Sequence, residues 1–437
     1  MSSTSIRVAE LFAGVGGFRL ALDGYHDSRF PNLDSPSAGP FRTIWANQWE
    51  PPGTPTKQFA WTCYEHRFGE GSCLNRDISL VLDDAEAGIA SIPDVDMVVG
   101  GFPCQDYSVA KPLAQAGGIE GEKGVLWWSI YRFLDLKRPR FCLFENVDRL
   151  LKSPVKQRGR DFAIILSCLN SLGYSAEWRV VNSAAYGFPQ RRKRVFIYAE
   201  RDAAHWNLPH RICHGIMARA LPIHEPDKYH EVDVSSEPYI LTKDFNARGA
   251  QSPFDIAGAM QAGVAQTAHV CEAYGGPYLT LGDVVVSDDE VPPRFFVEPE
   301  QLPRWSYLKG AKRERRISRS NGHEYFYSEG SMAFPDLLEN PSRTILTSEG
   351  GRGATRSKHI IQTSNGRYRR LIPDELEQLQ GFPRGWTDTG MSDNRRAFCM
   401  GNALIVGIPH RIGREIAAEL RLRKATHSDN PSSKGMW

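Results

Sequence analysis

Short apolar runs that end in glycine or proline are the feature that most constrains this fold. The clearest run, Val-Asp-Met-Val-Val-Gly at 95–100, continues into Gly-Phe-Pro-Cys-Gln at 101–105. A β-branched run that stops at glycine and proline predicts a buried strand that leads into a loop. Open α/β sheets place their chemistry in such loops. Cys104 is therefore a candidate nucleophile, with a buried cysteine that only packs as the alternative.

The first 200 residues or so repeat this pattern, because short apolar runs alternate with longer mixed segments as in βαβ units. We expect strands at 6–10, 43–47, 97–100, 141–145, 177–182 and 194–198. We expect helices at 18–22, 58–68, 126–136 and 162–172, and further helices at 373–380 and 406–423.

Composition excludes several classes of protein. The chain has 437 residues, 41% hydrophobic and 24% charged, as in a globular protein with two or three domains or with one large core and an inserted smaller unit. It has no long apolar run and no charged-then-apolar leader, so we expect no membrane span or signal peptide and a cytoplasmic location. Its eight cysteines form no C-x-x-C pair, so structural disulfides and zinc are not expected. The net charge of only +2 means that any nucleic-acid surface must be local.

Regular patterning weakens after about residue 204. Residues 205–293 are rich in proline, glycine and polar residues, which indicates either an inserted domain or long loops. The segment 308–319 carries six basic residues against one acidic and precedes the aromatic run 325–327. Such a segment suits phosphate contact and base stacking, with a solvated charged face as the equal alternative. The polar tail 425–437 is expected to be disordered.

A glycine-rich turn follows the first strand, in Ala-Glu-Leu-Phe-Ala-Gly-Val-Gly-Gly-Phe at 9–18. A strand, a glycine turn and a helix in this order are typical of a nucleotide-binding βα unit, with a plain tight turn as the alternative. The spacing G-x-G-G lacks the third glycine of the dinucleotide fingerprint, so another adenosine-containing ligand is favoured over NAD. Trp49 and Asp77 follow the next turns and suit adenine stacking and ribose or adenine hydrogen bonds. Core packing and a helix cap are their alternatives.

Two further blocks supply partners for Cys104. Glu145 ends the strand at 141–145 and should project into the same crevice, where a carboxyl group of raised pKa can donate a proton to a ring nitrogen. The basic run at 190–194 opens the next apolar strand, and arginines there can clamp a carbonyl oxygen or a phosphate.

Together these blocks resemble the DNA (cytosine-5-)methyltransferase family, over about 200 residues at the N-terminal end and about 80 at the C-terminal end. The matching motifs stand in the family's order. They are Phe-Ala-Gly-x-Gly-Gly at 12–17, Pro-Cys-Gln at 103–105, Glu-Asn-Val at 145–147, Gln-x-Arg-x-Arg at 190–194, an Arg-x-Ile-x-Thr-like block at 343–351 and Gly-Asn-Ala at 401–403.

The resemblance implies a chemistry. A methyl group would pass from S-adenosyl-L-methionine to C5 of a flipped-out cytosine in duplex DNA, leaving S-adenosyl-L-homocysteine, with no metal required. Cys104 would add to C6 as the thiolate, and Glu145 would hold or protonate N3. Arg194, with Arg192 nearby, would bind the O2 side and neutralise developing charge. Residues 105–125 resemble the family's mobile catalytic loop.

The resemblance also implies binding residues. The cofactor candidates are Phe12, Gly14, Gly16, Gln48, Trp49, Glu50, Asp77, Ile78, Pro103, Leu126, Asn402 and Leu404. Gln48 stands where many members carry an acidic residue, so either Gln48 or Glu50 would contact the ribose. The DNA-binding candidates are Gln105, Ser108, Lys309, Lys312, Arg313, Arg315 and Arg316.

The implied fold is α/β, a doubly wound and mostly parallel Rossmann-like sheet with an inserted, smaller target-recognition region. We expect a first catalytic part at 1–204, an insertion and recognition region at 205–365 with its DNA-reading part at about 291–357, and a catalytic return at 366–424. The implied protein is a sequence-specific modification enzyme of a restriction-modification system. We expect a monomer in the bacterial cytoplasm or nucleoid, with any cognate endonuclease acting separately.

Three other functions are alternatives to this one. The family's tRNA-methylating branch has a reduced recognition region and a Pro-Pro-Cys-Gln block, whereas here Phe102 precedes Pro103. A catalytically silent binding protein would be free to lose Cys104, Glu145 and Arg194. A nicotinamide oxidoreductase is the remaining interpretation of the glycine turn.

Overall fold

The computed structural model describes residues 5–51, 58–102, 126–247, 249–317 and 322–428. The chain divides into two compact units. The first comprises Met1–Tyr186, Lys193–Gly276 and Leu404–Trp437, and the second comprises Gly187–Arg192 and Pro277–Ala403. No helix among the described residues is long and apolar enough to cross a membrane.

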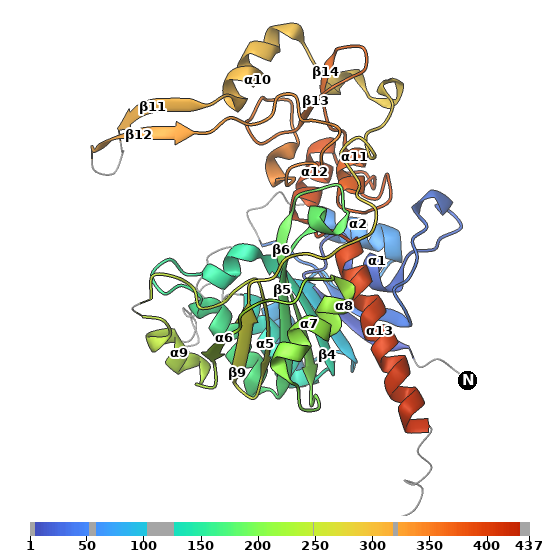
Figure 1. The fold of residues 1–437 in the computed structure, drawn as a ribbon. Coiled ribbons are helices and arrows are strands. Elements are labelled where there is room, and N and C mark those ends of the chain that lie inside the picture. The colour runs from blue at the N-terminus through green and yellow to red at the C-terminus, as the bar shows by residue number, and fades with distance from the viewer. Residues whose placement is uncertain (1–4, 52–57, 103–125, 248, 318–321, 429–437) are drawn as a thin grey trace, which may run out of the picture. The chain divides into compact units, whose positions relative to one another are not determined.

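The described part of the first unit contains one nine-stranded sheet, in the order β2-β1-β3-β4-β6-β5-β8-β9-β7 (Figure 1). The strands are β1 (Ile6–Leu11), β2 (Phe41–Asn47), β3 (Met97–Gly101), β4 (Phe141–Val147), β5 (Tyr174–Asn182), β6 (Lys193–Arg201), β7 (His230–Asp233), β8 (Ala257–Gln261) and β9 (Val264–Ala268). The pairs from β2 to β4 are parallel, and the later pairs are antiparallel. Six of these strands therefore run one way, and only β6, β8 and β7 run the other way. The predicted doubly wound, mostly parallel sheet is confirmed.

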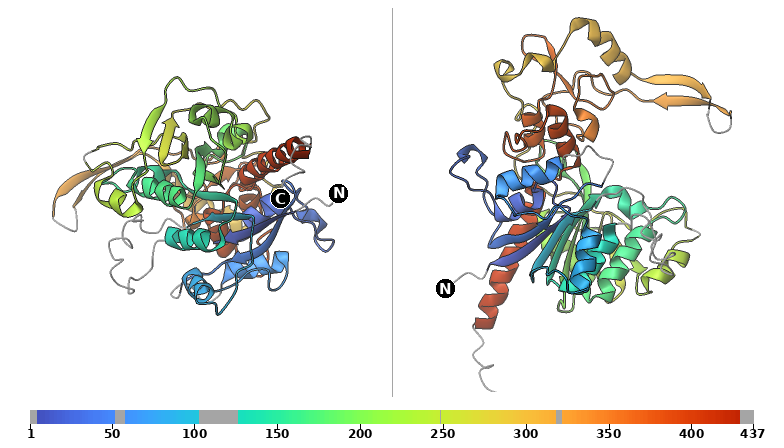
Figure 2. Two further views of the ribbon diagram at one scale, coloured as in Figure 1. Left: turned by 90° about the horizontal axis from the view of Figure 1, so that it is seen from below. Right: turned by 180° about the vertical axis from the view of Figure 1, so that it is seen from behind.

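Helices cover both faces of this sheet (Figures 1 and 2). They are α1 (Gly17–Asp23), α2 (Phe59–Phe68), α3 (Ile78–Glu86), α5 (Leu126–Lys137), α6 (Arg160–Ser171), α7 (Leu208–His214), α8 (Ile216–Ala220), α9 (Pro238–Asp244) and α13 (Gly407–Ser428). Helices α3, α5, α6 and α9 contact one another in turn, as do α1, α13, α8 and α7. The chain order reverses beside β1, which lies between β2 and β3. In an open α/β sheet, ligands bind outside the carboxyl ends of the strands at this point.

The core explains why residues beyond 204 join the first unit. Trp178 on β5 is fully buried, and its ring centroid lies 5.2 Å from that of Phe162 and 5.9 Å from that of Phe254. Strand β8 pairs with β5 over this ring, and a Cβ at Gly258 would come within 2.0 Å of Trp178 Cζ2. Only glycine permits this approach.

The second unit is smaller. Its strands are β10 (Phe296–Val297), β11 (Lys312–Ile317), β12 (Glu324–Glu329), β13 (Ile360–Gln362) and β14 (Tyr368–Arg370), and its helices are α10 (Leu302–Lys309), α11 (Pro373–Leu379) and α12 (Asp393–Asn402). Strands β10, β14 and β13 form one sheet, and β11 and β12 form a separate hairpin. A buried ion pair, with Arg369 Nη2 2.8 Å from Glu375 Oε1, ties β14 to α11.

These unit boundaries differ from the expected ones. Residues 205–276, expected within the insertion, extend the main sheet through β7, β8 and β9. Residues 366–403, expected in the catalytic return, belong to the second unit, and the chain rejoins the first unit only at Leu404. Apolar patterning did not reveal these boundaries, because strand β8 is built from small residues and because α11 buries its apolar positions within the second unit.

Candidate active site

The loop after β1 has a strained backbone. Phe12, Gly14 and Gly16 all have left-handed φ angles, of 54°, 56° and 84°. For the non-glycine Phe12 this conformation costs about 1–3 kcal/mol, and such strain is concentrated at ligand-binding sites. A Cβ at Gly16 would lie 2.4 Å from Cε2 of Phe68, whereas a Cβ at Gly14 would meet no described atom within 4 Å. The backbone at Gly14 is therefore open to close approach by a ligand.

A buried carboxylate, which the sequence reasoning missed, supports this loop from β1. Glu10 is 1% exposed, and its Oε1 accepts hydrogen bonds from the backbone N–H groups of Phe18 (3.1 Å) and Arg19 (3.4 Å). Its Oε2 accepts from the Tyr64 hydroxyl at 2.9 Å. Burial raises the pKa of Glu10 to about 7. The only signal in the sequence was one acidic residue near the end of an otherwise apolar run.

Glu10 bears on the kind of ligand that the loop can hold. The N–H groups of Phe18 and Arg19 belong to the first turn of α1 and have no partner within the helix. Dinucleotide-binding folds use this helix end for the pyrophosphate. Here a carboxylate already occupies it. The arrangement favours a ligand without phosphate groups and disfavours a nicotinamide dinucleotide.

The segment after β2 is held by amide side chains. Gln48 Oε1 accepts from the Gly14 N–H at 2.8 Å, so the amide oxygen of Gln48 is committed to the glycine loop. The Glu50 N–H donates to Gln58 Oε1 at 2.8 Å, and Gln58 Nε2 donates to the Glu50 carbonyl at 2.9 Å. Trp49 and Glu50 are half-buried. This pattern favours Glu50 over Gln48 as an acceptor for a ligand hydroxyl.

The next turn contains Asp77 and Ile78. Asp77 caps helix α3, since its Oδ1 accepts from the Ser79 N–H at 2.9 Å, and Ile78 is buried. The helix cap that is the alternative role of Asp77 is thus present, and it uses Oδ1 of the carboxylate. Asn47 Nδ2 donates to the Arg76 carbonyl at 2.8 Å. The loops after β2 and before α3 are therefore joined to each other.

The carboxyl ends of β3 and β4 lie side by side. Gly101 pairs with Glu145, and Phe102 is buried directly after it. Asn146 Nδ2 donates to the Phe102 carbonyl at 3.1 Å, which holds the end of β3 in place. The predicted residues Pro103, Cys104, Gln105 and Ser108, and the loop 105–125, lie outside the described residues.

Glu145 and Arg194 form an ion pair at this edge of the sheet. Arg194 Nε lies 2.9 Å from Glu145 Oε1, with the two side chains 18% and 12% exposed. Their strands, β4 and β6, are antiparallel neighbours, with Val147 opposite Arg194. A Cβ at Gly101 would lie 3.3 Å from Glu145 Oε2, so the carboxylate lies over the end of β3. The structure thus brings two of the predicted catalytic side chains together where the chain continues toward Cys104.

Arg192 has a different environment. It is 2% exposed within the second unit, where Nη1 donates to the Ile345 carbonyl (3.2 Å) and Nη2 to the Gly401 carbonyl (3.0 Å). Gln190 is fully buried and contacts the same region, since the Ile345 N–H donates to its Oε1 at 2.9 Å. Arg192 thus holds backbone carbonyls of the second unit, and its catalytic role stays a prediction.

The remaining cofactor candidates are distributed over both units. Leu126 begins α5 and is half-buried, and Leu404 is buried in the first unit. Asn402 ends α12 in the second unit and is exposed.

Comparison with known proteins assigns the family. Residues 6–418 match the family model described as C-5 cytosine-specific DNA methylase. The chain belongs to this family. The methylase is 42% identical over 422 residues to Type II methyltransferase M.Sau3AI of Staphylococcus aureus, with 94% of this chain and 95% of the relative covered. It is 30% identical over 414 residues to Type II methyltransferase M.Bsp6I of Bacillus sp. (strain RFL6), with coverage of 94% and 98%.

Solved structures agree on the fold of the methylase. It resembles a mutant of Spodoptera frugiperda DNMT2, with a TM-score of 0.55 at 15% identity over 94% of this chain and 99% of that one. It also resembles the Dnmt2 methyltransferase of S. pombe, with a TM-score of 0.55 at 13% identity over 96% and 99%. The chain is thus a DNA cytosine-5 methyltransferase of the type II restriction-modification kind.

The basic segment of the methylase contains two kinds of side chain. The Lys309 side chain is fully buried, with Nζ 3.1 Å from Asp336 Oδ2, and Lys312 is 10% exposed, with Nζ 3.5 Å from Glu329 Oε2. Both lysines have structural partners. The other predicted DNA contacts, Arg313, Arg315 and Arg316, lie on β11 and are exposed.

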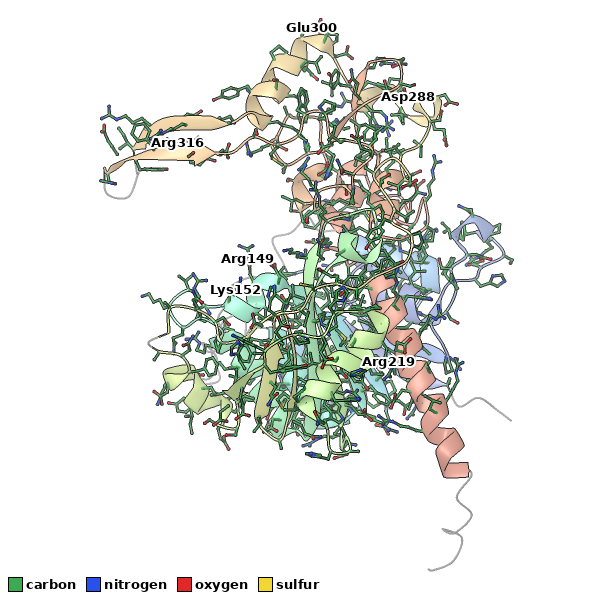
Figure 3. All side chains as sticks on the ribbon, in the orientation of Figure 1. Arg149, Lys152, Arg219, Asp288, Glu300 and Arg316 are labelled. Atoms are coloured by element: carbon green, nitrogen blue, oxygen red, sulfur yellow. The ribbon has the colours of Figure 1, made fainter. Side chains whose placement is uncertain are left out.

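Two cations missed in the sequence follow the Glu-Asn-Val motif. A 3-10 helix (Asp148–Lys152) continues directly from β4 and carries Arg149 and Lys152, both exposed (Figure 3). Their position immediately after a predicted catalytic motif was the available signal. Exposed cations here suit contact with phosphate groups.

Proposed function

We propose that the methylase adds the Cys104 thiolate to C6 of a cytosine flipped out of duplex DNA and methylates C5. The observation that carries this proposal is the ion pair between Glu145 and Arg194 beside Gly101. Cys104 follows Gly101 by three residues. A nucleophile, a carboxyl group and a guanidinium can then converge on one pyrimidine ring.

The proposed steps balance as follows. The Cys104 Sγ–C6 bond forms while the ring's C5–C6 π electrons move to C5, which becomes nucleophilic. S-adenosyl-L-methionine, when bound, supplies a methyl group on a positively charged sulfur. The C5 carbon takes that methyl group, a base removes the C5 proton, and elimination of the Cys104 thiolate restores the ring. The products are 5-methylcytosine, S-adenosyl-L-homocysteine and the free enzyme.

Glu145 and Arg194 would act on the ring during addition. Glu145 would bind or protonate N3, which makes C6 more electrophilic. Arg194 would bind the O2 side and offset the negative charge that develops there. The ion pair holds both side chains before substrate arrives, so little reorganisation is needed at the moment of reaction.

The methyl donor would bind at the loop after β1, where the phosphate-binding helix end is taken by Glu10. An adenosine derivative without phosphates fits this site better than a dinucleotide does. Trp49 and Ile78 would contact the adenine, and Glu50 the ribose hydroxyls. Gln48 would hold the glycine loop through the Gly14 N–H.

The proposed substrate is double-stranded DNA, read by the second unit and bound by a monomer. Arg149 and Lys152 would contact phosphates beside the flipped base. By analogy with the type II relatives, methylation would protect sites from a separately acting endonuclease, and the enzyme would act in the bacterial cytoplasm or nucleoid.

The test is transfer of a labelled methyl group from S-adenosyl-L-methionine to plasmid DNA and to tRNA in parallel. We expect label in plasmid cytosine only, and no transfer by a Cys104→Ala variant that still binds DNA. A duplex with 5-fluorocytosine at the target should trap a covalent complex with the wild type, because fluorine cannot leave C5 as a proton does. Undiminished transfer by Cys104→Ala, or label in tRNA alone, would refute the proposal.

A further inference from the structure

The second unit carries a hairpin that packs on little else. Strands β11 and β12 pair in register from Lys312 opposite Glu329 to Ile317 opposite Glu324, and among the described residues neither strand joins another sheet. In Figure 1 the hairpin extends away from α10, and Figure 3 shows Arg316 toward its far end. An isolated two-stranded hairpin is only marginally stable in water. A hairpin this exposed within its unit therefore suggests a binding surface.

On one side of the hairpin, which we call the paired face, acidic and basic side chains form ion pairs with each other. Side chains alternate between the two sides of a strand. The paired face carries Lys312, Glu314, Arg316, Tyr325, Tyr327 and Glu329. Arg316 Nη2 lies 2.9 Å from Glu314 Oε2, and the Tyr307 hydroxyl of α10 donates to Glu314 Oε1 at 2.8 Å. This face holds the hairpin to α10.

The opposite side, which we call the open face, carries basic and apolar side chains. It carries Arg313, Arg315, Ile317, Glu324, Phe326 and Ser328. Ile317 and Phe326 are 64% and 63% exposed, and the guanidinium carbon of Arg313 lies 5.0 Å from the centroid of the Phe326 ring. Arg315 pairs with Glu324, but both side chains are largely exposed, so this ion pair contributes little to the stability of the hairpin. Arg313 has no ion-pair partner among the described residues.

The dimensions of the hairpin suit one kind of partner. A two-stranded ribbon fits the major groove of B-form DNA. Six-residue strands span roughly 20 Å. Cationic side chains can neutralise phosphates along the groove walls, while apolar side chains can contact thymine methyl groups and base edges.

We propose that β11 and β12 enter the major groove as a ribbon with the open face toward the bases. Arg313 and Arg315 bind phosphates, and Phe326 and Ile317 contact bases. The paired face is turned away from the DNA. This inference rests on the proposed function only in taking duplex DNA as the substrate.

Charge favours DNA over a second copy of the chain as the occupant of the open face. The open face carries Arg313 and Arg315 against the single acid Glu324, so two such faces packed together would both be net positive. Like charges at short range oppose that contact, whereas they attract phosphates.

Neighbouring aromatic residues on opposite faces give a matched test. Phe326→Ala alters the open face and Tyr325→Ala the paired face. Binding to a fluorescent duplex that carries the methylation site is measured by anisotropy over a series of salt concentrations. We expect about tenfold weaker binding for Phe326→Ala, roughly 1.4 kcal/mol, and less than threefold for Tyr325→Ala.

Arginines provide the second pair. Arg313→Ala should reduce the slope of log K against log salt by about 0.9, the value for one phosphate contact. Arg7→Ala should leave the slope near that of the wild type, because Arg7 lies at the amino end of β1 and is paired, with Nη2 3.1 Å from Asp96 Oδ1. Circular dichroism of each variant confirms that the fold is kept.

The outcomes separate the inference from the proposed function. If the wild type methylates DNA and the open-face and paired-face variants bind equally well, the ribbon proposal is wrong while the proposed function stands. If Phe326→Ala abolishes self-association in sedimentation and leaves DNA binding unchanged, the open face binds a second copy and the proposal is again overturned. If the wild type methylates no DNA, both proposals are overturned.

Discussion

Replacing Glu10 by glutamine should change how the stability of the methylase depends on pH. Glu10 is 1% exposed, and burial raises its pKa from an ordinary 4.5 to about 7. Between these values the folded protein keeps a proton that the unfolded chain releases. The stability that this retained proton gives the folded protein is fully present below about pH 4.5 and is lost as the pH rises through 7. A difference of about 2.5 pKa units corresponds to roughly 3 kcal/mol.

The Glu10→Gln variant removes this titration, and its amide nitrogen replaces Oε2, so the Tyr64 hydroxyl accepts a hydrogen bond there instead of donating one. The amide oxygen can still accept from the Phe18 and Arg19 N–H groups, and the side chain keeps its size. Urea unfolding from about pH 4.5 to 8 should give similar free energies for both proteins at the acid end. At the upper end the wild type should be less stable than the variant by up to about 3 kcal/mol.

A matched control is Glu70→Gln, since Glu70 is an exposed glutamate. Its pH dependence should follow that of the wild type. If the wild type and Glu10→Gln change stability in parallel across the whole range, burial does not raise the pKa of Glu10, and the reasoning fails.

Three further changes test other parts of the structure. Asn146→Ala removes the hydrogen bond to the Phe102 carbonyl, so the residues after β3 are less well positioned. We expect kcat in steady-state methyl transfer to fall by about ten- to a hundredfold. An unchanged kcat would contradict this. Trp178→Ala should destabilise the protein by about 3–5 kcal/mol in urea unfolding, since the ring is fully buried; a loss below 1 kcal/mol would count against the packing described. Lys309→Met should lower the free energy of unfolding, because Lys309 is buried against Asp336. It should leave the salt dependence of DNA binding unchanged. A shallower slope of log K against log salt would show that Lys309 contacts DNA.

Much of the first unit could be predicted because its signals are local. Short apolar runs predicted the strands from β1 to β6, and the structure contains all six with shifts of a few residues. Glu145 and Arg194 were predicted to share a site, and they form an ion pair. Residues at the carboxyl ends of adjacent strands meet at the same edge, so strand order alone brings them close.

Other features depend on partners far away in the chain. Lys309 and Arg313 belong to the same basic segment, yet one is buried against Asp336 and the other is exposed. Arg192 and Arg194 are two residues apart, yet Arg192 binds backbone carbonyls of the second unit and Arg194 pairs with Glu145. Composition cannot separate such neighbours.

The sequence by itself determined the order of the motifs, the strand ends that carry them and the family to which they point, because each depends on a short stretch of chain. The tertiary structure alone decided that β8 extends the main sheet, that Glu10 occupies the end of α1 and that only one face of the hairpin is open. Burial and charge pairing arise from contacts between distant segments, so they exist only once the chain has folded.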